Sequence, residues 1–185
     1  MAIAKRKKRF FDVEIPLVNK VTQLQAYESK ELQGKYLLYD LTRLLRGKGA
    51  ILKLRVSVEG DKATSNPIEL KIMPSFIRRM MRKGVNYIED SLSIECKDAV
   101  LRIKPFLITR KKVSKAVQKA LREKVKEELT EYVKTKDVKI LFEDIMKNKI
   151  QKSLSLKLKK IYPLSLCEIR FFAIESQKTS TPSEK

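Results

Sequence analysis

The stretch AVLRIKPFLITRKKVSKAVQKALREKV, residues 99–125, joins a strand pattern to a helix pattern through three consecutive basic residues. Its first part is rich in apolar side chains, which is typical of a strand buried in a sheet. From Val113 the apolar residues recur at the three- and four-residue spacing of an amphipathic helix, and this spacing continues to Lys134. The stretch therefore predicts both a strand and a helix within one segment.

Similar patterns occur on both sides of this stretch. Alternating apolar residues predict strands at 11–15, 35–41, 51–58, 68–73, 87–96, 99–108 and 166–174, with a hairpin turn at Lys97-Asp98. Helical spacing predicts three further helices, at 75–84, 135–145 and 149–158. Ser75 is the expected N-cap of the first, and Gly84 its expected end. The segment 149–158 also fits a strand, through Leu154, Leu156 and Leu158. The fold class that follows is α+β, with an antiparallel sheet and flanking amphipathic helices.

The composition describes a folded protein with a highly charged surface. A chain of 185 residues with 43% hydrophobic residues is long enough for one domain with a real core. Its 42 Lys+Arg against 22 Asp+Glu give a formal charge of +20, which a polyanionic partner would neutralise. No apolar run reaches the length of about 18 residues that a membrane span needs, and no signal or lipidation motif is present. Nucleic acid is the expected partner, no membrane is expected, and the cytoplasm is the expected location.

The positive charge is concentrated in four segments. Residues 1–9 carry +5, residues 76–84 carry +4, residues 102–126 carry +9 and residues 147–160 carry +6, so the rest of the chain is slightly acidic. Concentrated charge of this kind is typical of surfaces that bind a polyanion.

The two ends of the chain differ in composition from the part between them. The first segment contains five consecutive bases, Lys5, Arg6, Lys7, Lys8 and Arg9, without apolar periodicity, and we expect an arm that contacts nucleic acid. A solubilising tail or a localisation signal is the alternative. Residues 175–185 are rich in Ser, Thr and Pro and are expected to be a disordered polar tail. Residues 10–174 are then the single folded domain.

The helix predicted from Val113 has an unusual order of charges. Lys115, Lys119 and Arg122 lie on one outer face, and the acids follow mainly in its later turns. A helix stabilised by its own dipole has acids first and bases last, so this order is unfavourable for the isolated helix. An ordinary solvated face is the alternative, but the self-repulsion of the bases favours a surface that binds phosphates.

The chain lacks the residue on which most hydrolase mechanisms depend. The chain has no histidine, so the commonest general base and metal ligand is absent. Cys96 and Cys167 have no Cys-x-x-Cys partner, and RGKGA at 46–50 lacks the pattern of a phosphate-binding loop. We expect no enzyme, cofactor, metal or small-molecule substrate. Aromatic residues make up 7% of the chain and lie mostly in apolar stripes, so contact with the nucleic-acid backbone is favoured over base stacking.

Four segments together resemble the archaeal and eukaryotic small-subunit ribosomal protein family S-three-a, also called e-S-one. They are YDLT at 39–42, FIRRMMRKGVNYIEDSLSIECKDA at 76–99, VLRIKPFLITRKKVSKAVQKALRE at 100–123 and IYPLSLCEIR at 161–170. The resemblance covers roughly Phe10 to Ile174. It departs at Arg43 and Leu44, where the family usually has glycine and an acid, and at Ala99, where it tends to have glycine. The chain lacks the long lysine-rich ends of eukaryotic members and is more similar to archaeal ones.

The resemblance implies a β-barrel-like core with flanking helices, and a helix at 149–158. It also implies a place on the platform of the small ribosomal subunit near the messenger RNA exit, with small-subunit rRNA and neighbouring ribosomal proteins as partners, and messenger RNA close by. The positions that match for RNA contact are Arg78, Arg79, Arg82, Lys83, Arg110, Lys111, Lys112, Lys115, Lys119 and Arg122.

The sequence thus predicts a structural constituent of the small ribosomal subunit that binds the rRNA backbone in translation. Two alternatives remain open at this point. One is an RNA-binding or RNA-chaperone protein that acts away from the ribosome. The other is a metal-dependent nuclease, whose carboxylates would have to meet in the fold.

Overall fold

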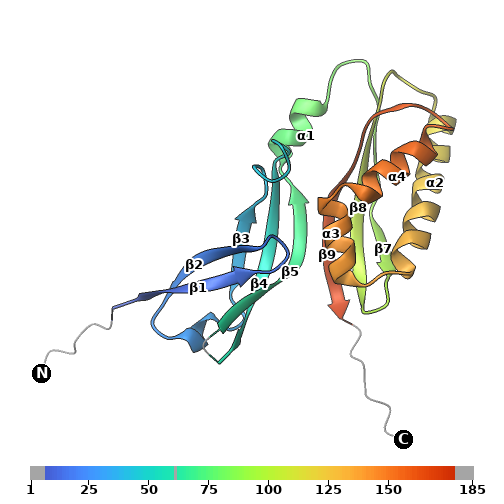
Figure 1. Cartoon of the computed structure of the whole chain (residues 1–185). Coiled ribbons are helices and arrows are strands. Elements are labelled where there is room, and N and C mark those ends of the chain that lie inside the picture. Colours follow the sequence, from blue (N-terminus) through green and yellow to red (C-terminus); the bar gives the residue numbers. More distant parts are fainter. Residues whose placement is uncertain (1–6, 61, 178–185) are drawn as a thin grey trace, which may run out of the picture. The chain divides into compact units, whose positions relative to one another are not determined.

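The computed structural model of this chain describes residues 7–60 and 62–177 (Figure 1). The strands are β1 (Arg9–Ile15), β2 (Lys20–Ala26), β3 (Tyr36–Asp40), β4 (Ala50–Glu59), β5 (Lys62–Ile72), β6 (Tyr87–Glu89), β7 (Leu92–Glu95), β8 (Ala99–Thr109) and β9 (Leu164–Gln177). The helices are α1 (Pro74–Met80), α2 (Lys115–Lys134), α3 (Val138–Met146) and α4 (Lys149–Leu158), with a short 3-10 helix at Ser29–Leu32. This mixture confirms the α+β class.

The described residues form two compact units. The first unit contains residues up to 40 and residues 52–68, and the second contains residues 41–51 and those from 69 onward. The division into an arm, one domain and a tail stays a prediction. Strand β9 continues to Gln177, so the first three residues of the predicted tail belong to the sheet. Residues 1–6 and 178–185 lie outside the described ranges.

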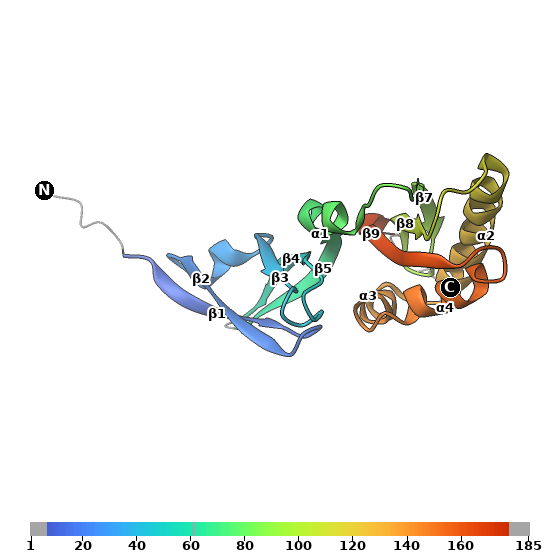
Figure 2. The same ribbon diagram turned by 90° about the horizontal axis from the view of Figure 1, so that it is seen from above.

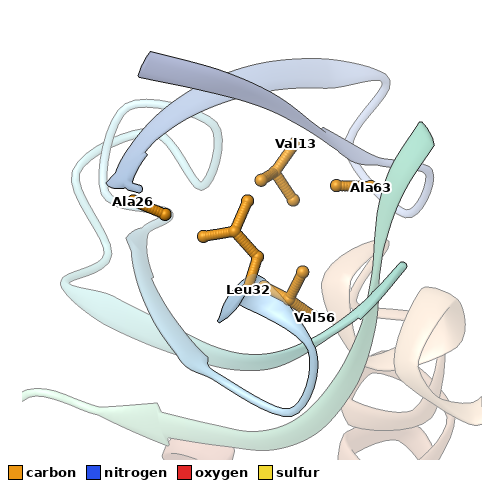
Figure 3. Packing of buried hydrophobic residues seen from close by; sticks show 5 residues of the cluster. All are labelled: Val13, Ala26, Leu32, Val56 and Ala63. Carbon is orange, nitrogen blue, oxygen red and sulfur yellow. The ribbon is translucent and has the colours of Figure 1, made fainter. Parts of the chain in front are cut away.

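The first unit is built from strands around a small apolar core. Strands β1 and β2 pair antiparallel from Arg9↔Ala26 to Ile15↔Lys20. Strand β1 also pairs with β5, and strand β4 pairs with both β3 and β5. The side chains that point into this core come from β1, β2, β4, β5 and the 3-10 helix, and Figure 3 shows them facing one another: Val13, Ala26, Leu32, Val56 and Ala63.

The predicted antiparallel β-barrel-like core is not confirmed. Within the described residues the strand pairing of this unit follows the order β3-β4-β5-β1-β2, and β2 and β3 do not pair with each other. The sheet is therefore open. The pairing of β1 with β5, at Val13↔Ala63, is parallel and not antiparallel. Alternation along a strand shows which face is buried but does not show which strand is the partner, or in which direction it runs.

The second unit is organised around strand β8, which is buried at most of its positions. Strands β6 and β7 pair antiparallel with β8, as Ile88↔Leu107 and Ile94↔Leu101, and β9 pairs with its other edge from Ala99↔Gln177 to Thr109↔Leu164. The end of β5 then pairs antiparallel with β9 through Leu70↔Phe172. The long antiparallel pairing expected from the apolar segments at 99–108 and 166–174 is confirmed.

The helices of this unit cover its sheet with their apolar stripes. Figure 2 shows α3 and α4 on one side of β8 and β9, and α4 packs against β9 while α2 packs against β7. The rings of Phe142 on α3 and Phe172 on β9 meet edge to face, with their centroids 4.8 Å apart. None of the helices in the described ranges is long and apolar enough to cross a membrane.

The boundaries of several elements differ from the prediction. The helix expected at 75–84 is shorter, because it ends at Met80, well before Gly84. Its N-cap is Met73 and not Ser75, since Pro74 takes the first helical position. The strand expected at 87–96 is interrupted after Glu89. Strand β2 was not predicted, since four of its seven residues are polar or charged. The hairpin between β7 and β8, the helix α3 and the helical alternative for 149–158 are confirmed.

A buried carboxylate connects the helices α2, α3 and α4. The Asp144 side chain is only 5% exposed, and it accepts hydrogen bonds from Lys136 Nζ at 2.5 Å and from Tyr132 Oη at 2.8 Å. Lys149 Nζ lies 3.4 Å from its other oxygen. Burial alone would raise the pKa of Asp144, but the hydrogen bonds from Lys136 and Tyr132 outweigh it, and the pKa lies below its usual value. These contacts hold the ends of the three helices together.

Asp144→Asn should lower the free energy of unfolding by about 2 kcal/mol at neutral pH, because it removes the partner of the Lys136 charge. The folded-state pKa of Asp144 lies below its usual value of 3.8, so the stabilisation is present above that pH and is lost as the pH falls through the folded-state pKa. Urea unfolding at neutral pH and in acid measures both effects, and the difference between variant and wild type should shrink in acid.

The matched control is Glu143→Gln, which changes the adjacent carboxylate of the same helix. Glu143 is exposed and pairs with the exposed Lys147 at a distance of 2.7 Å, where water screens the interaction. Removal of the Glu143 charge should change the free energy of unfolding much less than removal of the Asp144 charge. Equal effects of the two variants would contradict the role given to Asp144.

Candidate nucleic-acid interface

The first half of α2 separates an apolar face from a basic one. Leu121 and Val125 are fully buried on the inner side, whereas Lys115, Lys119 and Arg122 are exposed on the outer side. Ser114 caps the helix, because its hydroxyl accepts a hydrogen bond from Val117 N at 3.4 Å. The predicted row of three bases on one face of this helix is therefore present.

The two halves of α2 differ in how their charges are paired. In the second half, Lys124 pairs with Glu127 and Glu128, and Glu128 also pairs with Lys157 of α4. Because of the bond from Lys157, the pKa of Glu128 lies below its usual value. In the first half the three outward bases have one carboxylate near them, Glu123, whose oxygen lies 3.8 Å from Lys119 Nζ. The acids of α2 thus mainly neutralise the later turns and leave the first turns positive.

The three bases before α2, Arg110, Lys111 and Lys112, lie in an exposed loop whose ends are held by hydrogen bonds. The backbone N–H of Thr109 donates to Asn86 O at 2.9 Å, and the N–H of Asn86 donates to the Thr109 hydroxyl at 2.9 Å. On the far side of the loop, Val113 N donates to the Asn86 side-chain oxygen at 2.8 Å. Asn86 therefore bonds both ends of this basic loop.

The same contacts bring a second basic segment to the loop. Arg82 and Lys83 lie in the exposed connection between α1 and β6, which ends at Asn86. Strands β6 and β8 are antiparallel, so the segment that enters β6 and the segment that leaves β8 lie at the same end of the sheet. The structure thus brings together two basic segments that are more than twenty residues apart in the sequence. Sequence periodicity did not predict Asn86 as the residue that joins them.

Arg78 and Arg79 on α1 adjoin a basic turn that the sequence pattern did not predict. Both arginines are exposed, and Arg79 lies over the Phe76 ring, 5.4 Å from its centroid. A guanidinium nitrogen of Arg79 donates to Gly47 O at 3.4 Å. The turn that contains Gly47 also exposes Arg43 and Arg46. The signal that could have revealed these two arginines is the close spacing of basic residues at 43, 46 and 48, which need not form a phosphate-binding loop to bind an anion.

The basic arm belongs to the first unit. Lys5 and Arg6 lie outside the described residues. Lys7, Lys8 and Arg9 are exposed, and Arg9 is already the first residue of β1. The ammonium group of Lys8 lies 5.6 Å from the centroid of the Tyr27 ring, at the end of β2. Arg9, the last residue of the predicted arm, is therefore part of the sheet, and contact of the arm with RNA stays a prediction.

No catalytic centre is visible among residues 7–60 and 62–177. They contain no group of three or more His, Cys, Asp or Glu residues that could hold a metal ion. Burial raises the pKa of the Cys167 thiol to about 12, so it is protonated at neutral pH and a poor nucleophile. Glu89 is bonded by both of its oxygens to Arg170, at 2.9 and 2.8 Å. The geometry is that of a basic binding surface.

Comparison with known proteins finds one protein family and several of its archaeal members. The model of the Ribosomal S3Ae family matches residues 4–177 of the chain. The small ribosomal subunit protein eS1 of Methanothermobacter thermautotrophicus is 32% identical over 120 residues, which are 64% of this chain and 62% of that protein. That of Nanoarchaeum equitans is 27% identical over 186 residues, 94% of this chain and 91% of that protein. That of Pyrobaculum aerophilum is 28% identical over 181 residues, 91% and 82% of the two chains.

Asn86→Ala should loosen the basic loop, because the N–H of Val113 loses its acceptor while the backbone bonds to Thr109 remain. We expect faster amide hydrogen exchange at Val113 and a free energy of unfolding lower by about 1–2 kcal/mol. Hydrogen exchange followed by NMR measures the first effect, and urea unfolding measures the second. Asn66→Ala, at an exposed asparagine with one weak side-chain bond of 3.5 Å, is the control and should change neither. An unchanged exchange rate at Val113 would show that Asn86 does not hold the loop.

Proposed function

The chain belongs to the Ribosomal S3Ae family, and we propose that it is a structural constituent of the small ribosomal subunit that binds rRNA through its basic surfaces. The family predicted from the sequence segments is thereby confirmed, as is the expectation that the chain is not an enzyme. The proposal rests on the names of the relatives, each a small ribosomal subunit protein, and on the basic surface of the second unit. The observation that carries it is the exposed row on α2 beside the loop held by Asn86.

The charges of this surface favour phosphates. Arg82, Lys83, Arg110 and Lys112 are exposed, and no carboxylate pairs with them among the described residues. The first turn of α2 adds to this field, because the free N–H groups and the dipole at a helix N-terminus attract anions. The unfavourable placement of bases at this end of the helix is offset when a polyanion lies against them.

The geometry suits contact with the RNA backbone. The row from Lys115 to Arg122 extends about 10 Å along the helix axis, so it can follow a run of phosphates and does not depend on one. Long flexible side chains adapt to the spacing of phosphates, and contacts with phosphates carry no direct information about the base sequence. Affinity from such contacts depends strongly on salt and little on sequence.

The finer placement is also part of the proposal. From the family resemblance we propose a position on the platform near the messenger RNA exit, with neighbouring ribosomal proteins as further partners and a cytoplasmic location. An RNA-binding or RNA-chaperone role away from the ribosome is the alternative. Sedimentation of cell extracts in high salt distinguishes them: the proposed protein remains with small subunits in a one-to-one ratio, whereas a free chaperone is released.

Replacing Lys115, Lys119 and Arg122 together by glutamine should weaken binding of purified protein to small-subunit rRNA. Each lost phosphate contact should reduce the slope of log affinity against log salt concentration by about 0.7–0.9, so the triple variant should lose about 2 in slope. Filter binding over a range of salt concentrations measures the slope.

A second triple variant controls for the loss of charge alone. Lys134, Lys139 and Lys152 are exposed on the last turn of α2, on α3 and on α4, away from the start of α2. Their replacement by glutamine should change the slope much less. If both triple variants gave the same slope, the charge of the whole protein and not the α2 surface would govern binding.

A further inference from the structure

The outer surface of the first unit has a face in which aromatic, apolar and basic side chains lie side by side. Strands β3 and β4 pair, with Gly34 N donating to Val56 O and Val56 N donating to Lys35 O, each at 2.9 Å. This register places Tyr36 opposite Arg55 and Leu38 opposite Lys53. Figure 3 shows Val56 pointing into the core, so its neighbour Arg55 points outward.

We define the β3–β5 face by outward side chains in the middle of these strands, which are Tyr36, Leu38, Lys53, Arg55, Ser57 and Asn66. These six include two bases and no acid, and the acids Asp40 and Glu59 take the outward positions where β3 and β4 end. Arg55 is exposed and makes no ion pair within the described residues, and its guanidinium group lies beside Gly34. The face is therefore complementary in charge to an anion.

Tyr36 is the central feature of the β3–β5 face. Its side chain is 59% exposed, and the Lys53 ammonium lies 4.5 Å from the centroid of its ring. Leu38, two residues on along the same strand, is 66% exposed. Leaving a flat ring and a leucine in water is unfavourable, and a partner that covers them gains their apolar surface. A nucleotide is complementary to both features, because its planar base can stack on the ring and its phosphate can bind the ammonium group.

We propose that the β3–β5 face binds single-stranded RNA, with a base stacked on Tyr36 and the adjacent phosphates bound by Lys53 and Arg55. The inference rests on the proposed function, namely that the chain binds RNA, and it adds a second surface with a preference for unpaired nucleotides. A duplex keeps its bases stacked inside and offers no free base to Tyr36.

The polar residues on β5 extend the same face. Asn66 on β5 is exposed, and its amide nitrogen lies 3.5 Å from the Ser57 hydroxyl of β4. Thr64 donates to the backbone carbonyl of the same serine at 3.4 Å. The exposed amide of Asn66 and the half-buried hydroxyls of Ser57 and Thr64 can donate to and accept from a base edge. A base stacked on the sheet surface thus finds hydrogen-bonding groups within the same face.

The sequence argued against stacking because most aromatic residues lie in apolar stripes and not among the lysines. Strand pairing removes that reason for Tyr36. Lys53 and Arg55 are far from it in the sequence but adjacent to it on the sheet. Stacking on an exposed aromatic ring contributes roughly 1–3 kcal/mol per base and tolerates any base.

The test compares a labelled oligouridine with a short duplex RNA, each titrated with the full chain and followed by fluorescence anisotropy. Tyr36→Ala should weaken oligouridine binding roughly tenfold and leave duplex binding within about twofold. Tyr36→Phe keeps the ring and should bind both RNAs like the wild type. Replacing Lys53 and Arg55 together by glutamine should weaken oligouridine binding and flatten its salt dependence. Circular dichroism melting shows whether each variant is folded.

Each other outcome has a definite meaning. Wild-type binding to duplex but not to oligouridine overturns the inference and leaves the proposed function intact, whereas binding to neither RNA overturns the proposed function itself. If Tyr36→Ala weakens binding of both RNAs equally, or weakens binding of neither, stacking on Tyr36 is overturned. If Tyr36→Ala binds both RNAs normally but no longer associates with purified small-subunit proteins, the face is a protein interface, and the inference is wrong.

Discussion

Strand β8 is the element on which the arrangement of the second unit depends. It is hydrogen-bonded on one edge to β6 and β7 and on the other to β9, and most of its side chains are buried. Its last residue, Thr109, shares hydrogen bonds with Asn86, and the basic loop and α2 follow within six residues. A continuous buried strand cannot shift its register without exposing apolar side chains, so the start of α2 and its row of bases are held at one place on the molecule.

The distribution of acids decides where the positive charge is available. A protein with a formal charge of +20 repels itself when folded, and its carboxylates can reduce that repulsion only near the bases they contact. Asp144 and Glu128 are hydrogen-bonded to lysines at the junctions between helices. The surface around Arg110 and the first turns of α2 has little such compensation. The same ion pairs that join the helices therefore leave this end of the unit as the one most suited to a polyanion.

Residues whose position follows from helix or strand periodicity were predicted well, and residues without such a pattern were not. The row on α2 was predictable because Lys115, Lys119 and Arg122 are brought together by helix periodicity alone. Strand β2 was missed because its apolar residues are few, and Val21 in it is exposed. The predicted start of α1 was one residue late, because a proline such as Pro74 can either break a helix or occupy its first position. The turn with Arg43 and Arg46 has no periodicity from which to predict it.

The sequence by itself determined the α+β class, the basic character of the surface, the absence of histidine and the family. These follow from composition, short-range periodicity and ordered motifs, which need no knowledge of long-range contacts. Only the tertiary structure decided which strands pair, that β1 and β5 run parallel, that Asn86 joins two basic segments, and that Tyr36 lies beside Lys53 and Arg55. The physical reason is that backbone hydrogen bonds between strands are the same for every sequence, so partner and register are chosen by how side chains from distant segments pack together.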